Sequence, residues 1–566
     1  LKFSSQVIFR VCVWLLIMPM RVVVSLWLAC FKLSVCERSP LNIVHIVVDD
    51  LRPELGAYGL PDRHTPNIDS LAASGVSFDR AYTQIAVCGP SRNSFLTGRR
   101  PDRSRSWNFI NHFREDHPEW TSLPGMFKKA GMNSLGAGKI YHPFLPPKWD
   151  GNNSWSHQAL PFDNPCWFYG ISCLPCVGRD GIHVKPKCND HGFGPGAVET
   201  CWCEIEATED VLTVDRALSL LDIAERDYKN HGKLFYLAVG LHKPHLPWQA
   251  SKKYFDIHRS RNISLAVHKT APKGMPGVAF SSCDSKSPWD PIADEDARNA
   301  RIAYYAATSG MDEQVGRVLD ALKKSNLLNN TAVILHGDHG WQLGEHGEWR
   351  KNTNFELGTR VPLIMSGPEW FMGRSAGSRS DAPTELVDLM PTFADLAGIE
   401  LSAVMQADET PLDGASLVPL VLQDRKLPGA SKHQMAFSQY PRRVKDPTRP
   451  WSGNGIDHTN RSLFTVMGYS VRTFDWRYTE WRRWQGDKLQ ADWSADGLIA
   501  SELYDHRNET MYPTDFDSRE NDNLSTNKTT SDDATGLQGI INQLSRVLRS
   551  EFGQEASSRL DDAYLV

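Results

Sequence analysis

The sequence predicts an α/β protein with a large, mainly parallel central sheet flanked by helices, and a smaller C-terminal α+β subdomain that carries an antiparallel sheet. Helix-like and strand-like segments alternate along most of the chain, which is typical of a parallel sheet with crossover helices. At 566 residues the chain exceeds the size that one compact core usually fills, so a large domain and a smaller one are expected. Hydrophobic residues make up 41% and charged residues 23%, which excludes a disordered or fibrous chain.

The first strand is expected at residues 42–50, where "NIVHIVVDD" is a continuous β-branched run that ends in two acids. Such a run is typical of a strand that is buried on both faces and carries functional groups at its carboxyl end. A helical pattern follows at 65–78, with Thr65 or Asn67 near its start and Gly75 near its end. Further helix and strand patterns alternate, and we expect them at 121–140, 211–245 and 300–340.

The expected domain order is a leader at 1–36, a main domain at 41–440 and a C-terminal subdomain at 455–555. The leader holds two apolar stretches, each shorter than the roughly 20 residues of a membrane span. We therefore interpret it as a secretory signal peptide, with a signal-anchor as the alternative. Between 143 and 199 the pattern dissolves into Gly, Pro, Asn and Cys, which indicates a cysteine-rich insertion.

Glycosylation motifs and cysteines agree with entry into the secretory pathway. Cysteines cluster from Cys166 to Cys203, and disulfides are favoured there over structural zinc in an oxidising compartment. With Cys283 they form an odd set once Cys88 is set aside, so at least one is unpaired or pairs between chains. The N-x-S/T acceptor candidates are Asn152, Asn262, Asn329, Asn460, Asn508, Asn523 and Asn527.

Acidic residues follow two apolar strand patterns at the points where the strands end. Asp49 and Asp50 end the first strand, and Asp338 and His339 follow "AVILHG". If these two strands are neighbours in one sheet, three carboxylates and an imidazole meet at the same edge. Such an oxygen-dominated set favours a hard cation, calcium or magnesium, over zinc.

The same region admits a second interpretation, in which zinc binds His339, Glu345 and His346. Zinc hydrolases with an H-E-x-x-H motif carry it on a helix. Here the neighbouring glycines Gly340 and Gly344 indicate a loop, so the hard-cation site remains the main prediction.

A cysteine motif occurs between the two acidic strand ends. Residues 88–92 read C-G-P-S-R, and L-T-G-R follows at 96–99. This pattern resembles the signature of the type I sulfatases, in which the formylglycine-generating enzyme oxidises the cysteine to formylglycine in the endoplasmic reticulum. The segments "GAGKIYHP", "LAVGLHKPHLPW" and "GDHGWQLGEHGEWRKNTNFE" are similar to the same family in order and spacing. The resemblance implies an alkaline-phosphatase/sulfatase-like fold.

The resemblance also implies roles for individual residues. One hydroxyl of the hydrated aldehyde at Cys88 attacks sulfur, and the other later releases sulfate. The implied calcium ligands, with magnesium as the alternative ion, are Asp49, Asp50, Cys88, Asp338 and His339. The implied catalytic residues are Arg92 and Lys139 at the aldehyde, His142 as base in the elimination step, and His242 and Lys351 at the sulfate and the leaving oxygen. The residues expected to be orienting, structural or part of a substrate-side wall are His245, His346 and Trp341.

The substrate that the resemblance implies is a sulfated glycosaminoglycan, with the 2-sulfate of terminal iduronate in heparan or dermatan sulfate as the bond that is cleaved. A sulfatase of another sulfated glycan and a phospho- or phosphonate-ester hydrolase are the alternatives within enzymes. A secreted glycan-binding protein without catalysis is the alternative outside them, although binding alone does not need a modifiable cysteine. The net charge of −5 gives no sign of a nucleic-acid partner, and no stable membrane partner is expected. Oligomeric state is not predicted.

Overall fold

The computed structural model describes residues 39–157, 202–204, 208–281, 289–406, 409–423, 433–448, 456, 458–507, 519–526 and 536–553. From Leu41 onward the chain forms one compact unit. The leader, most of the cysteine-rich insertion and the side chains of every cysteine except Cys88 lie outside the described residues. The signal peptide and the disulfides therefore stay predictions. Within the described ranges, none of the helices is both long enough and apolar enough to cross a bilayer.

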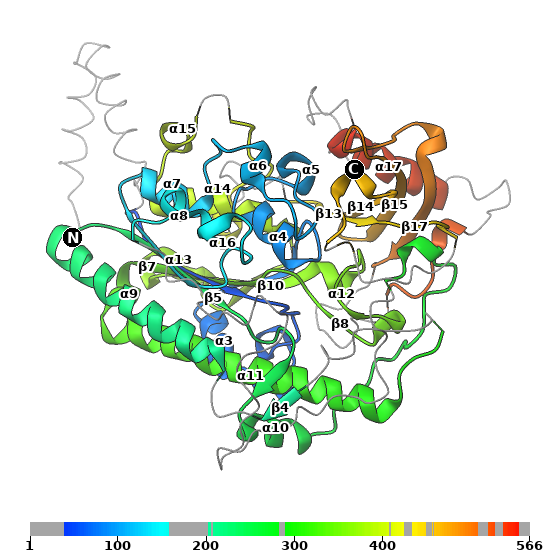
Figure 1. Ribbon diagram of the computed structural model, residues 1–566. Coiled ribbons are helices and arrows are strands. Elements are labelled where there is room, and N and C mark those ends of the chain that lie inside the picture. Colours follow the sequence, from blue (N-terminus) through cyan, green and yellow to red (C-terminus); the bar gives the residue numbers. More distant parts are fainter. Residues whose placement is uncertain are drawn as a thin grey trace, which may run out of the picture. The chain divides into compact units, whose positions relative to one another are not determined.

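The central sheet contains eight strands in the order β11-β2-β10-β7-β1-β5-β3, with β12 paired to β2 (Figure 1). Strand β10 runs antiparallel to both of its neighbours, and the other pairings are parallel. The expected mainly parallel sheet is confirmed, with one reversed strand. The strands are β1 (Asn42–Val48), β2 (Gly75–Tyr82), β3 (Asn133–Gly138), β5 (Phe235–Leu241), β7 (Thr331–Gly337), β10 (Arg360–Ser366), β11 (Ser378–Ser380) and β12 (Thr384–Glu385).

Strand β1 lies between β5 and β7, and its side chains are buried on both faces of the sheet. Ile43 and Val47 pack into the core on one face, while Val44, Ile46 and Val48 pack into the core on the other. Because successive side chains of a strand point to opposite faces, burial on both sides requires an unbroken apolar run. This explains the continuous pattern that precedes Asp49.

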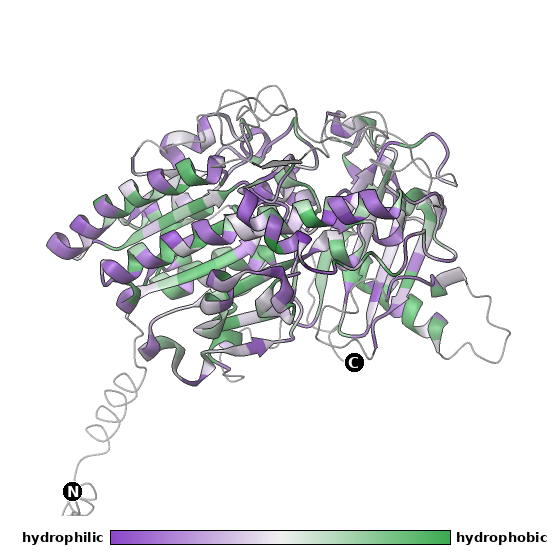
Figure 2. Cartoon of the chain, turned by 90° about the horizontal axis from the view of Figure 1, so that it is seen from below, coloured by the Kyte–Doolittle hydropathy of each residue, from purple (hydrophilic) through white to green (hydrophobic). Residues whose placement is uncertain are grey.

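Helices cover both faces of the sheet (Figure 1). One face packs against α3 (Pro66–Ala73), α9 (Glu209–His231) and α11 (Asp294–Lys324). The opposite face packs against α4 (Cys88–Phe95), α7 (Leu123–Lys129), α14 (Leu389–Ala397) and α16 (Val418–Val421). Figure 2 shows the apolar strands enclosed between helices whose outer faces are hydrophilic. Polar groups at the ends of β1 and β7 are thereby kept at one edge of an apolar sheet.

The antiparallel C-terminal sheet has the order β13-β14-β15-β16, with β17 paired to β15. It begins at Ala436, which lies before the expected subdomain start at 455 and inside the range expected for the main domain. Helix α17 packs its apolar face on this sheet. The elements are β13 (Ala436–Arg442), β14 (Val466–Arg472), β15 (Trp476–Gln485), β16 (Gln490–Ala491), β17 (Leu498–Asp505) and α17 (Leu537–Phe552).

Shorter elements connect these layers. Strand β4 pairs with β6, and β8 pairs with β9. The shorter elements are α5 (Pro101–Ser104), α6 (Phe113–Asp116), α8 (Gly151–Ser154), β4 (Trp202–Glu204), β6 (Trp248–Ala250), α10 (Lys252–Arg259), β8 (Gln342–Leu343), β9 (Trp349–Arg350), α12 (Glu356–Thr359), α13 (Glu369–Met372) and α15 (Leu401–Val404).

The predicted helix at 65–78 is replaced by a strand in its last part. Helix α3 starts after Thr65 and ends at Ala73, and β2 starts at Gly75. A Cβ atom at Gly75 would lie 2.4 Å from the carbonyl oxygen of Met365 in β10. The glycine therefore permits close pairing of β2 with β10, which the helical pattern concealed.

The structure separates the glycosylation candidates by their exposure. Asn152, Asn262, Asn329 and Asn460 are exposed, so they stay candidates. Asn523 is completely buried, and its amide nitrogen donates to the carbonyl oxygens of Gly274 and Ser501. A glycan cannot be carried by this nitrogen in the folded protein, so Asn523 is corrected from an acceptor candidate to a structural residue. Asn508 and Asn527 lie outside the described residues.

Candidate active site

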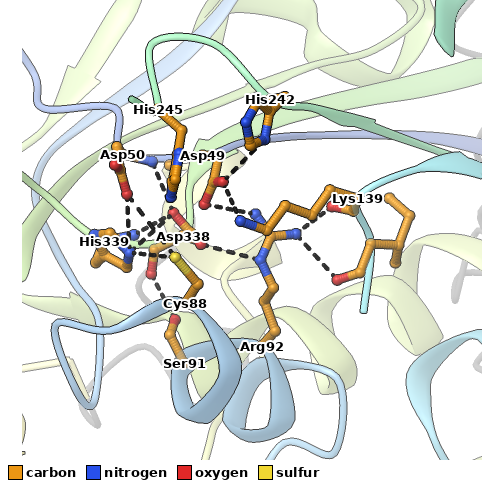
Figure 3. Close-up of polar contacts among 12 residues, drawn as sticks. Asp49, Asp50, Cys88, Ser91, Arg92, Lys139, His242, His245, Asp338 and His339 are labelled. Carbon is orange, nitrogen blue, oxygen red and sulfur yellow. Dashed lines mark hydrogen bonds and ion pairs between the residues drawn. The ribbon is translucent and has the colours of Figure 1, made fainter. Parts of the chain in front are cut away.

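The ends of β1 and β7 bring the predicted acidic residues together (Figure 3). The strands are parallel neighbours, and their ladder continues past Val48, because Asp338 donates its amide to the Val48 carbonyl at 3.1 Å. The backbone amides of Asp50 and His339 both donate to Asp338 Oδ1, at 3.1 and 3.0 Å. Asp49, Asp50, Asp338 and His339 are all fully buried.

Cys88 opens the eight-residue helix α4 and faces this cluster with a free thiol. Its Sγ lies 3.2 Å from His339 Nε2 and 3.9 Å from Asp50 Oδ1, and Lys351 Nζ donates to it at 2.9 Å. Burial raises the pKa of the Cys88 thiol, and the charge of Asp49 raises it further. The unmodified thiol is therefore held in its neutral form. The cysteine motif and the acidic strand ends form one site.

The donor set fits a divalent cation. Ligand atoms of Asp49, Cys88, Asp338 and His339 lie within 4.8 Å of one another. The Oδ2 atom of buried Asp50 has no hydrogen-bond partner among the described residues, and such orphaned buried oxygens usually indicate a missing ligand. His339 Nδ1 donates to the carbonyl oxygen of Gly340 at 2.9 Å, which leaves the lone pair of Nε2 directed at the cluster.

The alternative zinc set is not assembled. Glu345 lies in a separate buried network, where Arg52 Nη2 donates to it at 3.0 Å and Arg301 also pairs with it. Burial tends to raise the pKa of Glu345, but the charges of these two arginines outweigh it and lower the pKa to about 2. Glu345 therefore stabilises the fold as a carboxylate of an ion pair and does not face His339.

The three carboxylates differ in their affinity for protons. Burial tends to raise the pKa of Asp49, but the charges of Lys139 and other nearby cations outweigh it and hold that pKa well below its usual range. Burial raises the pKa of Asp50 to about 6, although Lys351 opposes the rise. Burial and the charge of Asp49 raise the pKa of Asp338 to about 7. Crowding of carboxylates without water is costly unless a cation shares the site.

Arg92 joins the two strand ends and does not donate to the cysteine. Its Nε donates to Asp338 Oδ2 at 3.0 Å, and its Nη2 donates to Asp49 Oδ1 at 3.2 Å. Its Nη1 donates to the carbonyl oxygens of Lys139 and Ile140. The structure thus places Arg92 as a clamp on two carboxylates, in contrast to the aldehyde contact that the resemblance implied.

Lys139 and His142 follow β3. The Lys139 ammonium is buried and pairs with Asp49 Oδ2. His142 is partly exposed and stacks on Phe109, with 4.4 Å between ring centroids, and Phe109 lies against Gly89. Burial and the charge of Lys139 lower the pKa of His142 well below its usual value, so its imidazole is neutral.

The two histidines of the HKPH segment have different surroundings. His242 Nε2 lies 3.4 Å from Glu209 Oε1, and its Nδ1 lies 3.5 Å from Asp49 Oδ2. A ring nitrogen of His245 lies within 4.8 Å of Cys88 Sγ and of the Asp49 and Asp50 carboxylates. Figure 3 shows both rings above the acids, with His245 nearer to Asp50 and His242 nearer to Lys139. His245, which the sequence analysis expected to be orienting or structural, therefore lies beside Cys88.

Lys351 lies beside the cysteine. Its ammonium donates to Asp50 Oδ1 at 2.7 Å as well as to Cys88 Sγ. Trp341 is buried beneath it, with the ring centroid 5.4 Å from Nζ, so Trp341 supports the lysine and is not an open wall of the site. Glu209, Asp210 and Lys243 also contact this region, and the sequence analysis did not select them. The adjacent acids at a helix start could have indicated Glu209 and Asp210, and Lys243 lies within the quoted segment LAVGLHKPHLPW.

The fold and the site together define a hydrolase of the alkaline-phosphatase-like class. A model of the sulfatase family matches residues 41–399. The human iduronate 2-sulfatase is 33% identical over 85% of this chain and 93% of its own length, and the mouse iduronate 2-sulfatase is 34% identical over 82% and 88%. Among solved structures, a phosphonate monoester hydrolase from Silicibacter pomeroyi superposes with a TM-score of 0.62 at 22% identity, covering 90% of this chain and 96% of its own.

A second solved protein, in complex with its substrate D-glucosamine-2-N,6-O-disulfate, has a TM-score of 0.60 at 19% identity and covers 93% of this chain and 99% of its own. At these identities the two solved structures establish the fold alone. The family model and the similarity to the iduronate 2-sulfatases establish the protein family. The chain belongs to the sulfatase family, and it is a sulfuric ester hydrolase.

Proposed function

We propose that this sulfatase removes the 2-sulfate from terminal iduronate of heparan and dermatan sulfate, through a formylglycine made from Cys88. The observation that carries the proposal is the free, buried Cys88 thiol among three carboxylates, an imidazole and an ammonium group. Neither packing nor a disulfide requires that constellation. The substrate is inferred from the iduronate 2-sulfatases, which match this chain over most of its length.

Calcium is the metal that the donor set fits best, with magnesium as the alternative. When bound, it supplies positive charge that neutralises the sulfate and polarises its oxygens. The hydrate of formylglycine supplies one hydroxyl for attack on sulfur and a second for the release of sulfate. The residues that hold the metal are Asp49, Asp50, Asp338 and His339, together with the modified side chain at position 88.

The remaining residues bind, neutralise and move protons. Lys351 places its positive charge beside position 88, where a sulfate approaches. His142 has a neutral imidazole and accepts a proton in the elimination step. We assign the sulfate contact expected of His242 to His245, which lies nearer to Cys88, and we assign His242 the orientation of Asp49.

The maturation step is tested by mass spectrometry of the peptide that contains Cys88, from protein produced in cells that make the formylglycine-generating enzyme. We expect the thiol to be lost and an aldehyde to be gained. An intact thiol in fully matured protein would instead favour the binding-protein alternative. Protein from cells that lack the modifying enzyme is the matched control. The proposal also places the protein in the secretory pathway, in the lysosome or outside the cell.

The substrate is tested by sulfate release from a 2-sulfated iduronate disaccharide. Glucosamine-sulfate and galactose-sulfate analogues, a phosphate monoester and a phosphonate monoester form the comparison panel. We expect the iduronate substrate to give the highest kcat/KM. A higher kcat/KM for another sulfated sugar would overturn the substrate, and turnover of the phosphorus esters alone would overturn the proposed reaction.

A further inference from the structure

A buried lysine supports the loop that carries His245. Lys243 is 1% exposed, and its Nζ lies 2.9 Å from Glu209 Oε1, 2.9 Å from the Pro247 carbonyl oxygen and 3.3 Å from the His245 carbonyl oxygen. A lysine ammonium has three N–H donors, and each of them has an acceptor here. Lys243 is therefore fully occupied inside the protein and is not available to a sulfated substrate.

The acceptor Glu209 lies in the first turn of α9, and Asp210 follows it. Asp210 accepts the backbone amides of His242 at 2.6 Å and of Lys243 at 3.0 Å. Glu209 pairs with the side chain of Lys243 and lies 3.4 Å from His242 Nε2. Negative charge is favourable at a helix N-terminus, so both carboxylates suit this position. Residues at the start of one long helix thus fix both the backbone and the side chains of the loop.

The loop presents His245 to the reacting position. His245 Nδ1 donates to the carbonyl oxygen of Leu246 at 2.6 Å, and a ring nitrogen of His245 lies within 4.8 Å of Cys88 Sγ. Because Lys243 holds the carbonyl oxygens of both His245 and Pro247, it determines how the chain turns between these residues. The position of the imidazole depends on that turn.

We propose that Glu209 and Lys243 are a positioning pair, which holds His245 in place to bind the sulfate group of the substrate. Neither residue touches the reacting atoms, and both act through His245. The inference rests on the proposed function, because it assigns His245 to sulfate at position 88. Loss of the ion pair leaves a buried charge without its partner, and a displacement of His245 by a fraction of an ångström weakens sulfate binding.

The test compares Glu209→Gln and Lys243→Met in the wild-type background and in a His245→Ala background. Affinity for inorganic sulfate is measured by calorimetry, and kcat/KM is measured with the best substrate of the panel. In the wild-type background we expect each substitution to weaken sulfate binding about tenfold and to lower kcat/KM by up to about 100-fold. In the His245→Ala background we expect a further change of no more than about twofold, because the residue through which the pair acts is already gone.

The matched control is Glu225→Gln, which removes an exposed ion pair with Lys229 on the same helix. We expect it to leave sulfate affinity and kcat/KM unchanged. Equal losses in both backgrounds, or an unchanged sulfate affinity in Glu209→Gln, would overturn the positioning role. Glu209→Gln keeps the size and the acceptor oxygen of the side chain. If Lys243→Met does not fold, the result for Glu209→Gln alone tests the positioning role. Failure on iduronate substrates with intact sulfate binding would overturn the proposed substrate and leave the positioning role standing.

Discussion

Two loops bring charged or imidazole side chains to the cysteine, and they are anchored to different parts of the fold. The loop His242–Pro247 is anchored within the main domain, since Glu209 of α9 pairs with its lysine. The loop Arg350–Asn352 is anchored to the C-terminal sheet, since Arg442 of β13 donates to the Asn352 carbonyl oxygen at 2.8 Å. The same site therefore depends on two supports that are distant from each other in the sequence.

The second loop has the less relaxed backbone. Arg350 and Asn352, on either side of Lys351, have φ angles of 72° and 78°. Residues other than glycine rarely adopt such angles. Arg442 also donates to the carbonyl oxygens of the adjacent residues Val278 and Ala279, so one buried guanidinium holds two chain segments against β13. The C-terminal sheet thus supports the loop that carries Lys351, while the loop that carries His245 is supported by α9 of the main domain.

The largest effect on activity is expected from removing the Cys88 side chain, beside which both loops place a residue. Cys88→Ala removes the side chain that we propose to be modified, and we expect sulfatase activity to fall to the level of a no-enzyme blank. Both loops keep their supports, so circular dichroism and thermal unfolding should show a folded protein. Sulfate release above the blank by purified Cys88→Ala protein would contradict the role of this residue.

A large loss of stability is expected from Glu356→Gln, which weakens the attachment of the C-terminal sheet next to the second loop. Glu356 is buried, accepts from Arg472 Nε at 3.1 Å and from Tyr82 at 2.8 Å, and pairs with Arg477. Removing one partner of a buried ion pair costs about 3–5 kcal/mol of the free energy of unfolding. Chemical unfolding at pH 7 measures it, with exposed Glu369→Gln as the control. A loss below about 1 kcal/mol, the level of a surface pair, would contradict the assignment.

The acidic strand ends were predictable because their signals are local. An unbroken apolar run before Asp49 requires a strand buried on both faces, and a second such run before Asp338 places its acid at the same edge. The choice between His242 and His245 was not predictable from the sequence, because contacts from a helix that precedes them in the chain determine which ring faces Cys88.

Long-range supports escaped the sequence analysis for the same reason. The hydrogen bond from Arg442 to Asn352 joins residues 90 positions apart, and only Asn352 lies in a segment that resembles the sulfatases. The start of the C-terminal sheet at Ala436 was also hidden, since β13 pairs with β14 only after a long connection. Position in a motif predicts which residues gather around Cys88 better than it predicts which residues support them.

An intermediate effect is expected from Arg442→Met, which removes the support of the Lys351 loop and keeps an apolar side chain in the core. Three carbonyl oxygens lose their donor, and we expect kcat to fall by about 100-fold as Lys351 shifts from position 88. Affinity for inorganic sulfate through His245 should change much less. The matched control is the exposed neighbour Arg443→Met. Equal effects on both loops would contradict their separate anchoring.

The smallest effect concerns pH and the buried carboxyl group of Glu502 in the C-terminal sheet. Trp481 Nε1 and the Tyr504 hydroxyl donate to it, both at 2.7 Å, and burial raises its pKa to about 7. In the unfolded chain the carboxyl ionises near its ordinary pKa, so between these two values the folded state binds one more proton. The contribution of Glu502 to the free energy of unfolding is therefore fully present in acid and is lost as the pH rises through 7, with a slope of up to about 1.4 kcal/mol per pH unit.

Glu502→Gln removes this slope, because the amide does not titrate. We expect the free energy of unfolding of the variant to vary less between pH 4.5 and 8 than that of the wild type, when both are measured by chemical denaturation. The control is the exposed residue Glu295→Gln, which should keep the wild-type slope. An identical pH dependence in Glu502→Gln would mean that Glu502 is already ionised in the folded protein.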